Sequence, residues 1–205
     1  MLIKKGAEAN LYLEEWHNRK VIMKRRLPKR YRIPELDEKI RSQRTIYEPQ
    51  VIHKAKEAGV PTPTIFMVDV AEANIIMEFV EGKQVKQVLD DLPLEERLRL
   101  SRHIGQLIGR LHNNGIIHGD LTTSNMILTP YDKVVFVDFG LSERSTELET
   151  KGVDLHLMKR ALQSTHYKHV KECFGAVMEG YAEVVGEEET KNVLEKIREI
   201  ERRGR

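Results

Sequence analysis

The apolar residues of this chain follow two different patterns, which change near residue 80. Up to that point they form short runs bounded by polar or glycine-containing stretches, a pattern typical of β-strands. Between two groups of such runs, residues 37–46 show helical spacing, and we expect a second helical piece from there to Ala58. The runs predict strands at 2–3, 11–13, 21–23, 64–70 and 74–79, with a turn over Gly6–Asn10.

Past Gly82 the apolar residues recur at helical spacing over longer stretches. Residues 95–112 predict one long helix, because apolar residues return every three or four positions. Two short apolar runs at 126–128 and 134–137 predict a hairpin. From Val153 onward the pattern is helical.

These patterns predict an α+β fold with a β-rich region over residues 1–80 and a mainly helical region over 81–205. A chain of 205 residues with 40% hydrophobic residues can bury a sizeable core. Its single cysteine, Cys173, cannot form an internal disulfide, which favours a reducing compartment. No apolar stretch has the length of a membrane span and the N-terminus lacks an apolar leader, so we expect a soluble, cytoplasmic protein.

The run HGDLTTSN, residues 118–125, lies between the long helix and the hairpin, whose second strand leads directly into Asp138-Phe139-Gly140. This order puts Asp120, Asn125 and Asp138 at the ends of neighbouring segments. Carboxylate and amide oxygens suit Mg²⁺ when phosphates supply its other ligands. A carboxylate spaced from the metal can accept the proton of an attacking hydroxyl or water. Any one of the three could be an ordinary turn residue, but together they indicate a site for a reacting group and a metal.

These motifs resemble those of the eukaryotic-like protein kinases, in which H-R-D-L-x-x-x-N precedes D-F-G with the same Asp-to-Asn spacing. The resemblance implies a bilobal kinase-like fold that uses ATP and Mg²⁺. By the same resemblance, Asp120 is the catalytic base or orients the nucleophile. Asn125 and Asp138 would be the ligands of a Mg²⁺ ion that bridges the ATP phosphates.

Further kinase parts are found in the first 80 residues. Lys24 ends the third strand in VIMK, where the family keeps its phosphate-binding lysine, although an isolated surface lysine is the alternative. Residues 77–80 resemble the linker between kinase lobes, in which backbone groups of Glu78 and Val80 would bind adenine. Gly6 is the one glycine in a turn where the kinase pattern has three.

Glu48 is the candidate partner of Lys24, by resemblance and by position. Pro49 follows it, which biases Glu48 away from helical geometry and removes a helix hydrogen bond. We therefore expect the helix to kink or restart at this point. The Lys24–Glu48 pair is then expected to be long or absent without nucleotide.

Two departures from the kinase pattern affect the expected activity. Gly119 stands where the family has the arginine that normally binds a phosphorylated activation segment. Only thirteen residues separate Gly140 from Asp154 and no A-P-E follows, so the helical lobe lacks the full activation segment that holds a peptide. Asp154 is expected to open the next helix, where it either braces the catalytic loop or caps the helix.

The chain as a whole resembles the small atypical kinase subunit of the KEOPS complex, which takes part in threonylcarbamoylation of tRNA adenosine. The resemblance rests on the GAEA turn, the block KRRLPKRYRIPELDEKIRSQRTIYE, GDLTTSN, DFGLS and the final ERRGR. It implies a Ser/Thr kinase that acts mainly as an ATPase in the complex. It also implies that the helical lobe binds the threonylcarbamoyl-transferase subunit and the β lobe binds a small regulatory subunit.

Basic residues are concentrated rather than spread evenly, although the formal net charge is only +2. Between Arg19 and Arg32 there are eight Lys or Arg residues and no Asp or Glu. Such a stretch suits tRNA phosphates, although a solvated basic face is the alternative. The candidates for contact with tRNA or a partner are Arg25, Arg26, Lys29, Arg30, Arg202, Arg203 and Arg205.

Two other functions compete with this reading. A small-molecule phosphotransferase of the aminoglycoside or choline type carries a similar H-G-D loop, but it usually needs extra helices to build an acceptor pocket. A pseudokinase that serves as a binding module would explain the poor phosphate loop. The presence of Lys24, Asp120, Asn125 and Asp138 argues against a pseudokinase.

Overall fold

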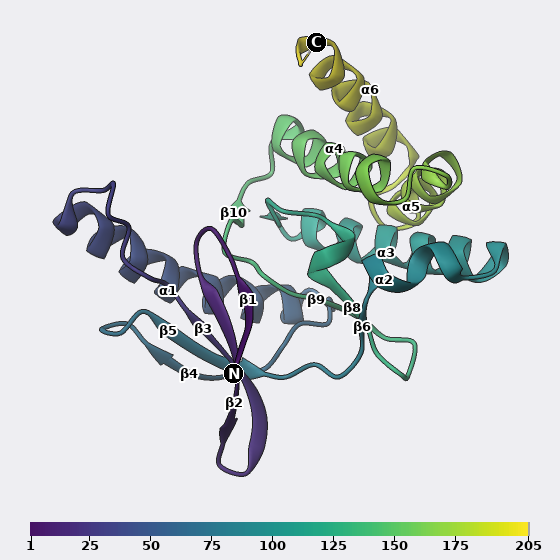
Figure 1. Cartoon of the computed structure of the whole chain (residues 1–205). Coiled ribbons are helices and arrows are strands. Elements are labelled where there is room, and N and C mark those ends of the chain that lie inside the picture. The colour runs from purple at the N-terminus through teal and green to yellow at the C-terminus, as the bar shows by residue number, and fades with distance from the viewer. Residues whose placement is uncertain (205) are drawn as a thin grey trace. The chain divides into compact units, whose positions relative to one another are not determined.

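The computed structural model describes residues 1–204, and these divide into two compact units. The first unit consists of Met1–Lys54 and Thr62–Val80, and the second of Ala55–Pro61 and the chain from Glu81 onward. Figure 1 shows the first unit in purple and blue and most of the second in teal, green and yellow. Within residues 1–204, no helix combines the length and apolarity that crossing a membrane requires.

The first unit is built on an antiparallel sheet with strand order β1-β2-β3-β5-β4. Its pairing is regular through β2, β3 and β5, where Val21 lies opposite Glu78 and Lys24 opposite Ile75. Both faces of these strands carry buried apolar side chains, with Val21 and Ile76 on one face and Ile75 and Met77 on the other. The strands are Leu2–Lys5 (β1), Asn10–Trp16 (β2), Arg19–Arg25 (β3), Ile65–Asp69 (β4) and Asn74–Glu78 (β5).

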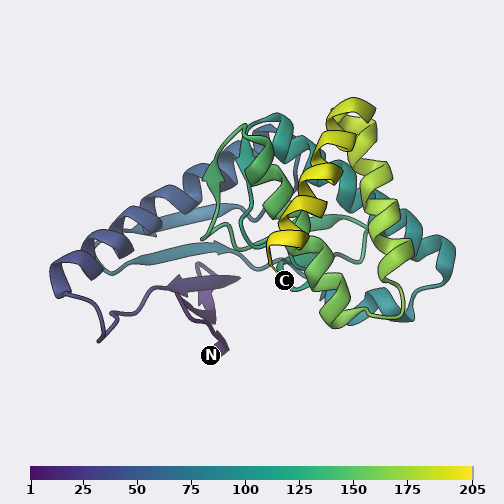
Figure 2. The same ribbon diagram turned by 90° about the horizontal axis from the view of Figure 1, so that it is seen from above.

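Helix α1 (Pro34–Glu57) runs alongside this sheet as one continuous element, which Figure 2 shows most clearly. The expectation of two helical pieces was therefore wrong, because Pro49 lies inside the helix. A proline in a helix interior costs about 3 kcal/mol. Tertiary contacts outweigh that cost, since Val51 and Ile52 in the following turn are 3% and 2% exposed.

The second unit is mainly helical and carries two small sheets, of order β6-β8-β9 and β10-β7. Helix α3 packs against α5, and α4 packs against α6. The expected hairpin is present as β8 paired with β9. The elements are Lys83–Gln84 (β6), Val85–Val88 (α2), Leu89–Asp91 (η1), Leu94–Asn113 (α3), Ile116–Ile117 (β7), Thr123–Asn125 (η2), Met126–Leu128 (β8), Val134–Phe136 (β9), Glu143–Arg144 (β10), Leu148–Thr165 (α4), Val170–Val185 (α5) and Glu187–Arg203 (α6).

Helices α3 and α5 approach each other backbone to backbone, and glycines make this approach possible. A Cβ added to Gly105 would lie 1.9 Å from the carbonyl oxygen of Val177, and one added to Gly180 would lie 1.9 Å from that of Arg102. No side chain fits at such distances. The core of the second unit therefore depends on glycine at both positions.

Candidate active site

The loop between β7 and β8 holds two of the predicted site residues in direct contact. The side-chain amide of Asn125 donates to the Asp120 carboxylate at 2.7 Å and to the Asp120 carbonyl at 3.0 Å. The backbone N–H of Val137 donates to the carbonyl of Asn125 at 2.9 Å. This last bond ties the loop to the strand end that leads into Asp138. The second unit thus joins Asp120, Asn125 and the D-F-G turn.

Asp138 has an unusual backbone conformation for an aspartate. Its φ is +65°, in the left-handed region, and the residue is partly buried. A non-glycine residue in this region is strained unless the surroundings hold it there. Phe139, the next residue, is completely buried and stacks at a tilt against His118, with the ring centroids 4.6 Å apart.

His118 is the buried first residue of the loop over residues 118–125. It is 1% exposed and lies edge-on to Phe136. Burial lowers the pKa of His118, although the charges of Asp154, Asp138 and Asp120 act in the opposite direction. The imidazole is therefore a neutral, largely apolar support at neutral pH. Its Nδ1 accepts a hydrogen bond from the Asp120 backbone N–H at 3.3 Å.

Asp154 braces the same loop from helix α4. Its carboxylate accepts from the backbone N–H groups of His118 and Gly119, both at 2.9 Å, and lies 3.1 Å from Nε2 of His112. The side chain is fully buried. The expectation that Asp154 opens the helix was wrong, because α4 begins at Leu148. The expected bracing of the catalytic loop is confirmed by these bonds.

The structure explains why glycine stands at position 119. Gly119 has a φ of +78°, and an added Cβ would lie 2.2 Å from the carbonyl oxygen of Leu141. The chain after the D-F-G turn passes this close because β10 pairs with β7, with Glu143 opposite Ile117. An arginine, the residue of the kinase pattern, has no room here.

A second buried support reaches the loop at Thr123, and the sequence did not reveal it. Thr123 Oγ1 lies 3.0 Å from Nε2 of His166, and Nδ1 of His166 lies 2.7 Å from the Asp90 carboxylate. An ionised carboxylate only accepts, so Nδ1 of His166 is the donor to Asp90. Thr123 and His166 are each 1% exposed, which makes the pair costly to break.

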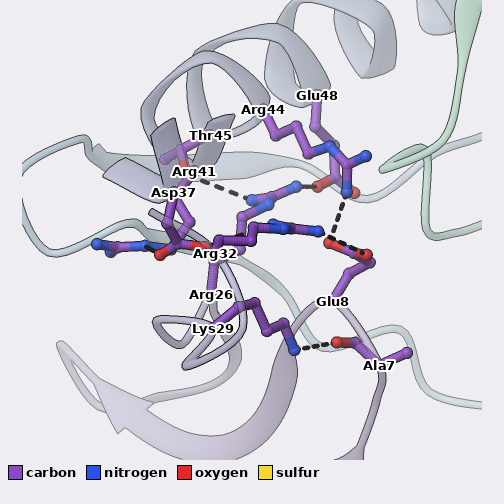
Figure 3. A network of polar contacts seen from close by, with 10 residues as sticks. All are labelled: Ala7, Glu8, Arg26, Lys29, Arg32, Asp37, Arg41, Arg44, Thr45 and Glu48. Carbon is purple, nitrogen blue, oxygen red and sulfur yellow. Dashed lines mark hydrogen bonds and ion pairs between the residues drawn. The ribbon is translucent and has the colours of Figure 1, made fainter. Parts of the chain in front are cut away.

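In the first unit, Lys24 and Glu48 form a tight buried pair, with Nζ and Oε1 2.7 Å apart. The expectation of a long or absent pair was therefore wrong. A third residue explains why the pair is short. Arg26 Nη2 lies 2.5 Å from the other carboxylate oxygen of Glu48. Figure 3 draws this contact. Two cations, Lys24 in β3 and Arg26 directly after it, compensate the burial of the Glu48 carboxylate and hold it in place, so Pro49 does not displace it.

Arg26 is consequently not a surface residue. It is 3% exposed, and its Nη1 donates to Thr45 Oγ1 at 3.4 Å. The prediction that Arg26 contacts tRNA or a partner was wrong for this reason. Lys29 is also used internally, since its ammonium donates to the carbonyl of Ala7.

The other basic candidates lie on exposed parts of their units. Arg25 forms a 3.5 Å pair with Glu72, and Arg203 forms a 3.0 Å pair with Glu149. Arg30 and Arg202 are exposed, whereas Arg205 lies outside the described residues.

The remaining first-unit candidates sit at strand ends. Gly6 begins the β1–β2 turn and donates its N–H to the carbonyl of Ala9 at 3.1 Å. The N–H of Glu78 donates to the carbonyl of Thr64 at 2.8 Å, so any adenine contact would fall to the Glu78 carbonyl. Val80 is partly buried.

Comparisons with known proteins agree with this geometry. Residues 6–169 match the protein kinase domain family. The KEOPS complex subunit Bud32 of Pyrococcus abyssi is 52% identical over 210 residues, covering 100% of this chain and 95% of that protein. The chain belongs to the Bud32 family of protein kinases. The family and the kinase-like fold expected from the sequence are thus confirmed.

Other Bud32 relatives differ in length. The EKC/KEOPS complex subunit bud32 of Dictyostelium discoideum is 36% identical, and the match covers 82% of it. A probable bifunctional tRNA threonylcarbamoyladenosine biosynthesis protein of Methanothermobacter thermautotrophicus is 48% identical, but the chain spans only 36% of its length. Among solved structures, a Rio2 kinase complex with ADP/Mg²⁺-phosphoaspartate from Chaetomium thermophilum has the same fold, with a TM-score of 0.66 at 18% identity. That match covers 98% of this chain and 70% of the Rio2 chain.

Proposed function

We propose that this Bud32-family chain binds Mg-ATP and transfers its terminal phosphoryl group, acting mainly as an ATPase and able to phosphorylate Ser or Thr. The observation that carries the proposal is the direct bond between Asn125 and the Asp120 carboxylate, on a loop tied to the residue before Asp138. Phosphoryl transfer is mainly a matter of positioning and charge neutralisation. A loop that presents Asp120 and Asn125, tied to the strand end that leads into Asp138, is suited to both.

Each candidate site residue of the second unit has a proposed role. Asp120 accepts the proton of the attacking water or hydroxyl, and its bond to Asn125 fixes the carboxylate. Asn125 and Asp138 supply oxygen ligands to Mg²⁺. Among the described residues, no group of three or more His, Cys, Asp or Glu side chains could hold a metal ion. Two protein ligands match Mg²⁺, which keeps several waters and takes phosphate oxygens.

The first unit supplies the nucleotide contacts in this proposal. Lys24 binds the α- and β-phosphates as a point charge, and Glu48 holds the ammonium in place at 2.7 Å. Gly6 begins the turn that covers the phosphates, and the backbone of Glu78 and Val80 binds adenine. Bound Mg²⁺ supplies neutralisation of the charge that develops on the phosphates.

We further propose that the chain acts within a KEOPS complex and supports threonylcarbamoylation of tRNA adenosine. The support is the full-length similarity to the KEOPS subunit of Pyrococcus abyssi. The second unit would bind the transferase subunit and the first unit a small regulatory subunit. Of the basic candidates named from the sequence, Arg25, Arg30, Arg202 and Arg203 are exposed and would be available to tRNA phosphates.

The test is phosphate release from Mg-ATP, with Asp138→Ala as the blank. It is run on the chain alone, then with the transferase subunit and bulk tRNA. We expect Asp120→Ala and Asp138→Ala each to lower turnover by at least roughly a hundredfold, the low end for losing a general base. Asp138→Ala should also weaken metal-dependent ATP binding.

Three results would contradict the proposal. Normal turnover in either variant would exclude the site. Strong labelling of a small alcohol would favour a small-molecule phosphotransferase, and nucleotide binding without turnover would favour a pseudokinase. For tRNA, engagement of about three phosphates predicts a log–log salt slope of roughly 3, and a slope near zero would exclude phosphate contact.

A further inference from the structure

The turn that joins β1 to β2 is fixed by side chains rather than by glycines. It contains one glycine, Gly6, whose added Cβ would lie 2.6 Å from the Ala9 carbonyl oxygen. The turn carries an acidic residue, Glu8, at its tip. Figure 3 shows Glu8 and Ala7 facing a group of basic side chains that comes from the β3–α1 connection and from α1.

Three cations reach this turn. Arg44 Nη1 on α1 donates to Glu8 Oε2 at 2.6 Å, and Arg32 Nη2 lies 3.6 Å from Glu8 Oε1. Lys29 donates to the carbonyl of Ala7. Both carboxylate oxygens of Glu8 and one backbone carbonyl of the turn are therefore held from outside.

The cations that hold the turn, Arg44, Arg32 and Lys29, are called the clamp below. One of them, Arg32, is anchored by a buried acid. Asp37 is 2% exposed, and its two carboxylate oxygens meet Arg32 Nη1 at 3.4 Å and Arg41 Nε at 2.8 Å. Burial would raise the pKa of Asp37, but hydrogen bonds from Arg41, the Lys29 backbone and Arg32 together outweigh it and lower the pKa. The carboxylate thus stays charged and keeps Arg32 in place.

The same helix also holds Lys24. Arg44 lies one helical turn before Glu48, whose carboxylate pairs with Lys24 at 2.7 Å. Helix α1 therefore fixes both the β1–β2 turn and the ammonium of Lys24. Isolated pairs on a surface contribute little, but a connected network with a buried anchor holds its members in one arrangement.

From this network we infer that Glu8 is a positioning residue for nucleotide phosphates, clamped by Arg44 and Arg32 in place of the missing glycines. The inference rests on the proposed binding of Mg-ATP. The clamp holds the turn in one conformation, so that its backbone N–H groups can donate hydrogen bonds to the phosphates. It also neutralises the Glu8 charge, which would otherwise repel the incoming phosphates.

Loss of Glu8 and loss of Arg44 should therefore have different effects on phosphate binding. Glu8→Gln weakens the clamp but removes the repelling charge. Arg44→Gln weakens the clamp and leaves the Glu8 charge less compensated, so it should impair phosphate binding more. In the double variant Glu8→Gln/Arg44→Gln no carboxylate remains to be compensated, and its effect should equal that of Glu8→Gln alone.

The experiment measures affinities for Mg-ATP and for adenosine by calorimetry on the full chain, together with KM and kcat for phosphate release. We expect a rise in the Mg-ATP dissociation constant of about threefold for Glu8→Gln and about tenfold for Arg44→Gln, in the range for losing a partly exposed pair and then a compensating charge. Adenosine has no phosphates, so its affinity should not change. The rise should appear in KM more than in kcat.

Lys39→Gln is the matched control, because Lys39 is an exposed cation on the same helix as Arg44, and it should leave both affinities unchanged. Equal affinity for Mg-ATP in all variants would overturn the inference. So would a parallel loss of adenosine affinity, or an Arg44→Gln effect no larger than that of Glu8→Gln. Failure of the wild-type chain itself to bind Mg-ATP would instead overturn the proposed function on which the clamp depends.

Discussion

Replacing Asp154 by asparagine tests how the second unit holds its catalytic loop. The substitution keeps the shape of the side chain and removes its charge. One native carboxylate oxygen accepts from the His118 N–H and lies near His112 Nε2, while the other accepts from the Gly119 N–H. Asparagine can put its oxygen at only one of these positions. Its NH₂ group must then face a buried backbone donor.

The cost can be worked out from these contacts. A buried N–H left without an acceptor costs about 1–3 kcal/mol, and the loss of charge weakens the remaining bonds by about 1 kcal/mol more. A total of about 3 kcal/mol is less than the 5–15 kcal/mol typical of a folded protein, so Asp154→Asn should still fold. For a chain of this length it lowers Tm by roughly 6–12 °C.

The assay combines thermal unfolding by circular dichroism with hydrogen exchange of the segment 116–121. We expect the amides of His118 and Gly119 to lose protection in Asp154→Asn. Asp91→Asn is the control, since Asp91 is exposed and lies in the same unit. A Tm within about 2 °C of wild type, with unchanged exchange at these amides, would refute the bracing role of Asp154.

Three further predictions concern the second unit. Gly119→Ala should destabilise it by about 1–3 kcal/mol in urea unfolding, because the added Cβ collides with backbone at positive φ, whereas Gly175→Ala, with open space around it in α5, should be neutral or stabilising. Thr123→Val removes the hydroxyl that meets His166 and should cost about 1–3 kcal/mol and lower phosphate release; unchanged stability and turnover would contradict the support. Burial raises the pKa of Tyr181 above its ordinary value of 10.0, so the unfolded chain ionises first and the unfolding free energy should fall above about pH 10, a fall that Tyr181→Phe should reduce.

The sequence predicted the elements well where one physical rule decides them. Strands β2, β3 and β5 coincide with short apolar runs, and helix α3 follows from apolar residues that recur every three or four positions. The expectation failed at Pro49, where the local rule for proline competes with tertiary contacts. Buried neighbours and the paired Glu48 outweigh the lost helix hydrogen bond, and a single sequence does not show these contacts.

The residues of the candidate site also divide into those that local spacing reveals and those that only the fold brings together. Asp120 and Asn125 were found because their spacing is fixed by the loop that joins them. Arg26 was placed on the surface because a run of basic residues does not show which side chain turns inward. Thr123 and His166 are 43 positions apart, and only the folded chain shows that they meet.

The supports of the catalytic loop come from chain that is synthesised after it. His118 and Asp154 are 36 positions apart, and His112 and its partner Tyr181 are 69 apart. At a synthesis rate of about 5–20 residues per second, the loop is synthesised several seconds before these supports exist. The close packing of α3 on α5 must also wait for Gly180. We therefore expect a nascent chain to carry all the proposed catalytic side chains before they can be held in position, and phosphate release to begin only once α5 has been translated.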